Sequence, residues 1–255
     1  MLRINGLETY CRLEGQGDPI VLLHGWGTSS QSVSTVAASL AEGFCVLVMD
    51  LPGFGWSQAP PVAWGIGDYA AHVERLMDEL AIARASLVGH SFGGRIAIGM
   101  SASHPARASR LALVASAGIR RRRRAGYYVR VGAFKLARWF FSLPGWRKTG
   151  RRMISNAANR FGSRDYRAAG PMRPTFVKVV NEDLTPLLPK IEAPTLLLWG
   201  DQDREVPRSA METMVARIPG ARLVVFDGAG HFPFLDAPEE FQRALIGFLQ
   251  GEGQR

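Results

Sequence analysis

Residues 89–93 read Gly-His-Ser-Phe-Gly and directly follow the apolar run 85–88. The run predicts a strand that ends in a sharp turn carrying Ser91, and the chain after Gly93 predicts a helix. Glycine has no Cβ, so glycines two residues before and after the serine let strand and helix pack closely around such a turn. The pattern therefore favours a serine nucleophile at the strand's C-terminal end, above a helix N-terminus that stabilises negative charge.

A serine hydroxyl needs a base, and the base needs a carboxylate to orient it. His104 and His231 are the two histidines after Ser91. His104 ends a predicted helix just before a proline, which favours a structural role. His231 lies in the glycine-rich segment 228–232, directly after an apolar run, so a loop can carry its imidazole back over the sheet. The sequence therefore predicts His231 as the base.

The carboxylate is expected in the short acidic loop that follows the apolar segment 195–200. Asp201 and Asp203 both qualify on chemistry, and a nucleophile–acid–histidine order along the chain holds for either. Helix capping and a solvated loop charge are the alternative roles for these aspartates. The loop thus supplies the acid without deciding between the two.

A second glycine-containing turn, His24-Gly25-Trp26, follows another apolar strand, 19–24. Acyl transfer creates an oxyanion, which backbone N–H groups can stabilise. We predict the N–H groups of Trp26 and of Phe92, the residue after the serine, as these donors. His24 is expected to hold the turn by hydrogen bonding rather than to titrate.

Five segments in this order resemble the α/β-hydrolase superfamily: 21–27, 50–57, 87–94, 194–207 and 228–238. The resemblance implies an α/β fold, with a mostly parallel sheet of about eight strands, helices on both faces and a helical lid insertion. It also implies that Asp203 is the acid, because Gly200 and Pro207 frame the family's motif, with Asp201 as the alternative. Asp50 is expected to be structural, bracing the turn that follows it.

The resemblance implies a serine esterase that needs no metal or organic cofactor and acts on a small-molecule ester. Epoxide hydrolases and haloalkane dehalogenases of this fold carry Asp where Ser91 stands, which disfavours both reactions. Haloperoxidase-like members, amidases, thioesterases, lactonases and acyltransferases use the same groups and stay open. A carbon–carbon bond hydrolase acting on a vinylogous diketone is the nearest rival, although its elbow often has Asn at the position of His90. A non-catalytic binding or lipid-docking member is the alternative of another class, and Ser91, Asp203 and His231 argue against it.

Length and composition are those of a globular protein, with 255 residues, 47% hydrophobic and 21% charged. The sequence shows no signal peptide and no apolar run of membrane-spanning length, so a cytoplasmic location is expected. Cys11 and Cys45 have no metal-ligand spacing and are expected as two buried thiols. The oligomeric state stays open.

Alternating strands and helices predict one core, 1–118 and 191–255, interrupted by an inserted cap, 119–190. The expected strands are 2–5, 7–14, 19–24, 44–49, 85–90, 110–115, 195–200 and 222–226. The expected helices are 31–41, 67–80, 93–104, 208–217 and 238–249.

The segment from Arg120 to Lys190 has 18 basic and 3 acidic residues, a net charge of +15, whereas the remainder carries −6. Three interpretations of this charge compete: a solvated cap surface, weak contact with an anionic membrane, and attraction of an anionic substrate or nucleic acid. Nucleic acid is not expected, since no nucleic-acid-binding fold surrounds Arg120–Arg124. Apolar residues near helical spacing are expected to pack the cap onto the core or line the acyl pocket: Tyr127, Tyr128, Val131, Phe134, Ala137, Trp139, Phe140 and Phe141.

Overall fold

The computed structural model describes residues 1–119, 132 and 164–252. The chain divides into two compact units, one formed by 1–120 with 174–255 and the other by 121–173. The described part of the second unit contains α6 (Arg164–Ala168) and a 3₁₀ turn (Gly170–Met172), and α7 (Arg173–Asn181) starts at its last residue. The arginine run 120–124 and the aromatic residues expected in the cap lie outside the described residues, so the cap stays a prediction.

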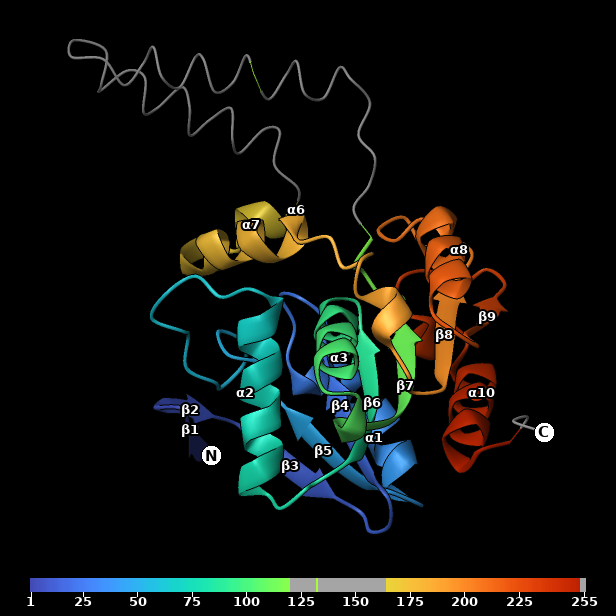
Figure 1. Cartoon of the computed structure of the whole chain (residues 1–255), viewed down its shortest axis with the longest axis horizontal. Helices are drawn as coiled ribbons and strands as arrows, with labels where there is room; N and C mark the ends of the chain where they lie inside the picture. Colours follow the sequence, from blue (N-terminus) through green and yellow to red (C-terminus); the bar gives the residue numbers. More distant parts are fainter. Residues whose placement is uncertain (120–131, 133–163, 253–255) are drawn as a thin grey trace. The chain divides into compact units, whose positions relative to one another are not determined.

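The larger unit is built on a seven-stranded sheet of order β3-β5-β4-β6-β7-β8-β9, drawn in Figure 1. All neighbouring pairs are parallel except β3 with β5. The predicted mostly parallel sheet is therefore confirmed, with seven strands among the described residues rather than about eight. Its strands are β3 (Cys11–Glu14), β4 (Pro19–Leu23), β5 (Cys45–Met49), β6 (Ala85–His90), β7 (Ala108–Val114), β8 (Thr195–Gly200) and β9 (Arg222–Phe226).

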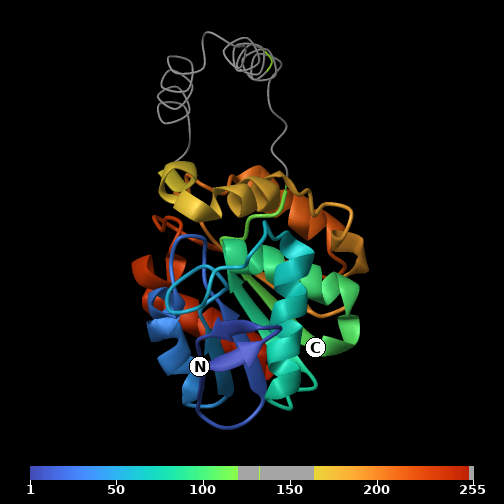
Figure 2. The same ribbon diagram turned by 90° about the vertical axis from the view of Figure 1, so that its left-hand side faces the viewer.

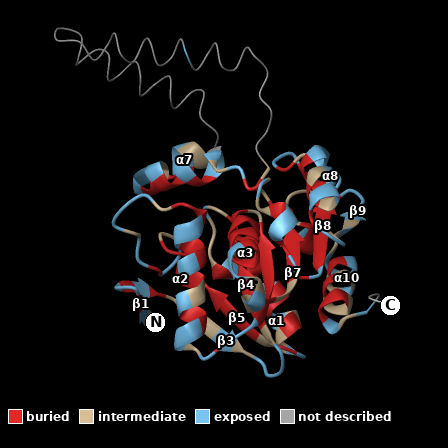
Figure 3. Cartoon of the chain, viewed as in Figure 1, coloured by how far each residue is buried: buried red, intermediate tan, exposed pale blue. Residues whose placement is uncertain are grey.

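Helices cover both faces of this sheet (Figure 2). One buried cluster joins it to α2 (Ile66–Glu79), α3 (Phe92–Ser103) and α8 (Arg208–Arg217). A second cluster joins the opposite face to α1 (Ser34–Ala41) and α10 (Pro238–Gln250). Figure 3 shows the buried residues concentrated in the sheet and the helix sides that face it. Strands covered on both faces read as continuous apolar runs, which is why the sequence revealed them clearly.

The expected strand 7–14 is divided in two in the structure. β1 (Leu2–Ile4) and β2 (Leu7–Thr9) form a separate two-stranded sheet, while β3 joins the main sheet beside β5. The break falls at Tyr10, whose N–H donates to Ser57 Oγ and whose carbonyl accepts from Asp50 N. Contacts with a segment some forty residues away thus divide a strand that local sequence reads as continuous.

Short elements complete the described part of the chain. The predicted helix 31–41 begins as a 3₁₀ turn (Ser30–Val33) before α1, and a short helix α9 (Pro233–Asp236), which the sequence did not predict, precedes α10. Two further 3₁₀ turns are Pro105–Arg107 and Leu188–Lys190. Among the described residues, no helix has the length and apolar character that crossing a bilayer requires.

Candidate active site

Ser91 sits in a strained turn between β6 and α3. Its φ of 52° and ψ of −104° are unusual for a residue with a Cβ. Two glycines make the turn possible: a Cβ on Gly89 would lie 2.5 Å from Gly93 O, and one on Gly93 would lie 2.3 Å from Leu23 O. The strain is thus held by close packing of strand, turn and helix, and it places Ser91 at the C-terminal end of β6.

His231 and Asp203 meet across the loops that follow β9 and β8. His231 Nδ1 lies 2.9 Å from Asp203 Oδ2, while Asp203 Oδ1 accepts the N–H groups of Glu205 (2.7 Å) and Val206 (3.0 Å). Burial by itself raises the pKa of Asp203, but the hydrogen bonds from His231 and from the two amides outweigh it and lower that pKa. An ionised acceptor keeps the imidazole proton on Nδ1, which leaves Nε2 able to accept a proton.

Asp201, the alternative acid, makes different contacts. Its Oδ1 accepts the N–H of Gly228 at 2.7 Å, and its Oδ2 accepts from Gln202 Nε2 at 2.9 Å. The bond with Gly228 holds the loop after β8 against the loop after β9. Asp203 is therefore the aspartate that contacts His231, and Asp201 positions the surrounding backbone.

Glu205 is a neighbour of the imidazole that the sequence reading missed. Its Oε2 lies 3.3 Å from His231 Nε2, the nitrogen expected to receive the serine proton. Among the described residues, no hydrogen bond joins Ser91 Oγ to His231 Nε2. Catalytic hydrogen bonds often shorten only when substrate binds, so the Ser91–His231 step remains part of the proposal below. The one sequence signal for Glu205 was the position of its carboxylate two residues after Asp203.

The predicted oxyanion turn lies against the serine turn because β4 and β6 are neighbouring parallel strands. An added Cβ on Gly25 would lie 3.6 Å from Ser91 Cβ. The Trp26 ring packs on Phe92 with centroids 5.2 Å apart. Phe92 is the first residue of α3, so its N–H has no acceptor within the helix. Both predicted donors therefore belong to the backbone next to Ser91.

His24 braces this turn, as expected from the sequence. Leu51 N donates to its Nε2 at 3.0 Å, so Nδ1 carries the proton and donates to Gly25 O at 2.8 Å. Burial lowers the pKa of His24 to about 4, which keeps the ring neutral. The next turn is held by Asp50, which accepts the N–H groups of Ser30 (2.7 Å) and Trp56 (2.9 Å). The bracing role expected for Asp50 matches these bonds.

His90 connects the serine turn to the histidine loop. Its Nε2 lies 2.9 Å from the backbone oxygen of His231, to which a neutral ring donates. Burial, together with a smaller effect of the nearby His231, lowers the pKa of His90 to about 3. The ring is neutral and fixes the backbone of His231 beside Ser91. By contrast, His104 Nδ1 contacts Glu74 Oε1 on an exposed surface, in keeping with the structural role expected for it.

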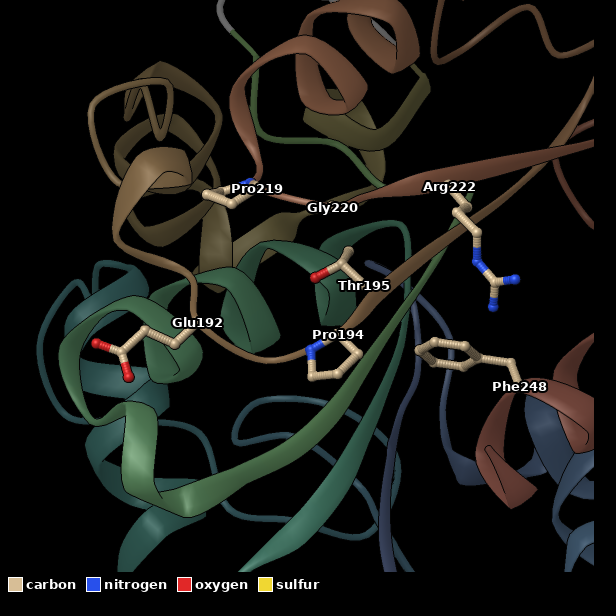
Figure 4. Close-up of a pocket in the computed structure, with 7 residues that line it drawn as sticks. All are labelled: Glu192, Pro194, Thr195, Pro219, Gly220, Arg222 and Phe248. Carbon is tan, nitrogen blue, oxygen red and sulfur yellow. The ribbon is translucent and has the colours of Figure 1, made fainter. Parts of the chain in front are cut away.

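The described residues hold no group of three or more His, Cys, Asp or Glu side chains that could bind a metal ion. A pocket of about 420 Å³ lies elsewhere, lined by Thr195, Arg222 and Phe248 among others (Figure 4). Thr195 and Arg222 begin β8 and β9, whereas the site follows the opposite ends of these strands. This pocket is therefore separate from the site around Ser91.

The chain belongs to the α/β-hydrolase fold family, whose model matches residues 18–238. It is 32% identical to a pimeloyl-[acyl-carrier protein] methyl ester esterase of Chromobacterium violaceum, over 92% of this chain and 96% of the relative. It is 28% identical to a 2-hydroxy-6-oxo-2,4-heptadienoate hydrolase of Pseudomonas putida, over 99% and 96% of the two chains. The crystal structure of a bacterial membrane phospholipase A matches with a TM-score of 0.75 and 28% identity, over 98% of this chain and 84% of that one. These relatives are thus an esterase, a dienoate hydrolase and a phospholipase.

Proposed function

We propose that this chain is a serine hydrolase that cleaves small-molecule carboxylic esters. The observation that carries the proposal is the 2.9 Å contact between His231 and Asp203, at the sheet edge where Ser91 occupies its strained turn. The bond from His90, the residue before Ser91, to the backbone of His231 supports a position of this pair near the serine. The similarity to a methyl ester esterase supports an ester as the substrate.

In the first half of the proposed reaction, Ser91 Oγ attacks the ester carbonyl carbon while its proton passes to His231 Nε2. Asp203 holds the proton on Nδ1 and stabilises the imidazolium that forms. The carbonyl oxygen becomes an oxyanion, which the backbone N–H groups of Trp26 and Phe92 bind. His231 then gives its proton to the departing alcohol, which leaves an acyl group on Ser91.

In the second half, a water molecule gives a proton to His231 Nε2 and attacks the acyl carbonyl carbon. The same two amides hold the second oxyanion, and the proton returns to Ser91 as the carboxylic acid leaves. Every proton in this scheme is accounted for by the imidazole and the serine. The proposed cycle therefore needs no metal ion or organic cofactor.

A carbon–carbon bond hydrolase is the second candidate, supported by the similarity to the heptadienoate hydrolase over nearly the whole chain. The same serine, histidine and aspartate can serve that reaction, because fold and triad do not determine the substrate. A hydrolysis screen separates the two candidates. It compares p-nitrophenyl esters of increasing acyl length with one vinylogous diketone, and higher kcat/KM on the diketone would replace the ester proposal.

The nucleophile is tested by Ser91→Ala and by labelling with a fluorophosphonate. We expect the parent to be labelled at Ser91, and the variant to stay folded and unlabelled and to lose ester turnover. Turnover within about tenfold of the parent would refute the mechanism, since losing a triad member typically costs several orders of magnitude. Absence of turnover and of labelling in the parent would favour a non-catalytic binding member instead.

We further propose that residues 119–190 form a basic helical cap over Ser91. The support is their position between the neighbouring strands β7 and β8 and their net charge of +15. Residues 174–190 within this range belong to the same compact unit as the sheet. We also propose a cytoplasmic location, with which the free thiols of Cys11 and Cys45, half-buried rather than buried, are compatible.

A further inference from the structure

Helix α7 is fastened to the core from Thr175 onward by polar contacts. Thr175 Oγ1 accepts the N–H of Trp64 at 3.3 Å. Just past the helix end, the Glu182 carboxylate accepts the N–H of Ile66, the first residue of α2, at 3.1 Å. Both ends of this segment therefore contact the chain that leads into α2, and α7 is part of the packed core.

Arg95 joins α7 to α3, the helix that directly follows the nucleophile turn. It lies in the first turn of α3, four residues after Ser91, and is only 6% exposed. Its Nη2 donates to the carbonyls of Val179 and Glu182, at 2.5 Å each. These carbonyls lie in and just beyond the last turn of α7, where helix carbonyls lack internal partners and carry partial negative charge.

The guanidinium of Arg95 stays charged at neutral pH in this environment. Burial lowers its pKa to about 10, and the nearby carboxylates of Glu182 and Asp183 oppose that change. Both bonds come from Nη2, whose two N–H groups are fixed in the guanidinium plane, whereas the donors of a lysine ammonium rotate freely. Arg95 therefore caps the C-terminal end of α7 and binds it to the helix that follows Ser91.

The other contact of α7 reaches the predicted oxyanion turn. Phe176, 9% exposed, packs on the indole of Trp26 with ring centroids 5.0 Å apart. The same indole contacts Phe54 at 4.8 Å and Phe92 at 5.2 Å. Trp26 is thus enclosed by rings from three separate segments, one of which is α7.

We infer that α7 positions the oxyanion hole, with Arg95 fixing the helix and Phe176 pressing Trp26 against Phe92. This inference rests on the proposed function and deepens it. Arg95 and Phe176 are positioning residues that act through Trp26. Oxyanion donors stabilise the transition state only when they are aimed at the developing charge, and a displacement of about 1 Å can cost about a hundredfold in rate.

The test compares Phe176→Ala with two controls, Phe176→Tyr, which keeps the ring, and Val180→Ala on the exposed side of the same helix. Active sites are counted with a fluorophosphonate, so misfolded protein does not enter kcat. We expect Phe176→Ala to lose about 10- to 100-fold in kcat on a p-nitrophenyl ester, with KM within about threefold of the parent. Both controls are expected within about twofold.

A trifluoromethyl ketone supplies a matching binding measurement, because its adduct with Ser91 carries an oxyanion. Its inhibition constant should rise in Phe176→Ala by the same factor as kcat falls. An effect confined to KM would show that Phe176 only lines the substrate pocket and would overturn the inference. Unchanged kcat per titrated site would overturn it as well.

A measurement that needs no turnover separates this inference from the proposed function. In protein labelled with ¹⁵N-tryptophan, Arg95→Lys should move the backbone amide resonance of Trp26 and leave that of Trp199 in place. A Trp26 resonance that does not move in the folded variant overturns the coupling, whether or not the parent hydrolyses esters. A parent without ester turnover refutes only the proposed function. If Arg95→Lys does not fold, the Phe176 series still decides the inference.

Discussion

Replacing Asp203 by asparagine tests the histidine–aspartate contact most directly. The carboxylate has two duties, since Oδ1 accepts two backbone N–H groups and Oδ2 accepts from His231 Nδ1. An amide has only one oxygen. If that oxygen keeps the backbone bonds, the NH₂ group faces Nδ1 and forces the ring proton onto Nε2. The imidazole then cannot accept the proton of Ser91.

The magnitude follows from this change of tautomer. We expect Asp203→Asn to lower kcat by about three to four orders of magnitude, as a wrong tautomer does in other serine triads. At about 1.36 kcal/mol per tenfold, the loss corresponds to about 4–5.5 kcal/mol of transition-state stabilisation. Asp201→Asn, whose partners are Gly228 and Gln202, should cost less than about tenfold.

The assay is initial-rate hydrolysis of a p-nitrophenyl ester by both variants, with circular dichroism and a urea midpoint as controls for folding. Asp201→Asn is the matched control, because it removes one charge from the same loop. A folded Asp203→Asn enzyme within tenfold of the parent would refute the reasoning. So would a larger loss in Asp201→Asn, which would identify Asp201 as the orienting acid.

Three further outcomes are expected. Because the pKa of Asp203 is lowered in the folded protein, its ionised carboxylate stabilises the fold above the unfolded pKa of about 4, and this stabilisation is lost as pH falls through the folded pKa. The urea midpoint should therefore fall less between about pH 5 and 3 in Asp203→Asn than in the parent. An equal fall of the urea midpoint in the two proteins would contradict this. His90→Phe keeps a ring beside Phe232 but loses the hydrogen bond to His231 O, so kcat should fall about five- to tenfold. An unchanged kcat would show that His90 does not position His231. Salt-sensitive co-sedimentation with phosphatidylserine vesicles should weaken when Arg120–Arg124 are replaced by serine, while equal recovery on neutral and anionic vesicles would leave only a solvated cationic surface.

Much of the fold was readable from local sequence. The predicted strands 85–90, 195–200 and 222–226 and the helix 208–217 coincide with β6, β8, β9 and α8. These elements carry continuous apolar runs or clear flanking turns, so their own residues define them. The break at Tyr10 and the 3₁₀ start of the first helix depend on distant partners, which local patterns do not contain.

The candidate site likewise contains residues that local sequence identifies and residues that depend on distant partners. The sequence singled out Ser91, Asp203 and His231 because each follows an apolar strand in a recognisable motif. Glu205, His90 and Arg95 gain their contacts only when separate segments meet, as in the 141-residue separation between His90 and His231. An arginine within the mostly apolar helix α3 was the one sequence signal for the residue that holds α7.

The backbone hydrogen bond from Leu184 N to Gly118 O, at 3.0 Å, joins the two ends of the long excursion between β7 and β8. β7 and β8 are themselves paired, so the sheet fixes where this excursion leaves and returns. The entropy of closing a loop grows only with the logarithm of its length. Residues between Gly118 and the start of α7 can therefore be lengthened, shortened or exchanged with little cost to the stability of the sheet. We expect the substrate range of such a chain to evolve by replacement of this inserted segment, while Arg95 and Phe176 keep the oxyanion hole aligned whichever segment is present.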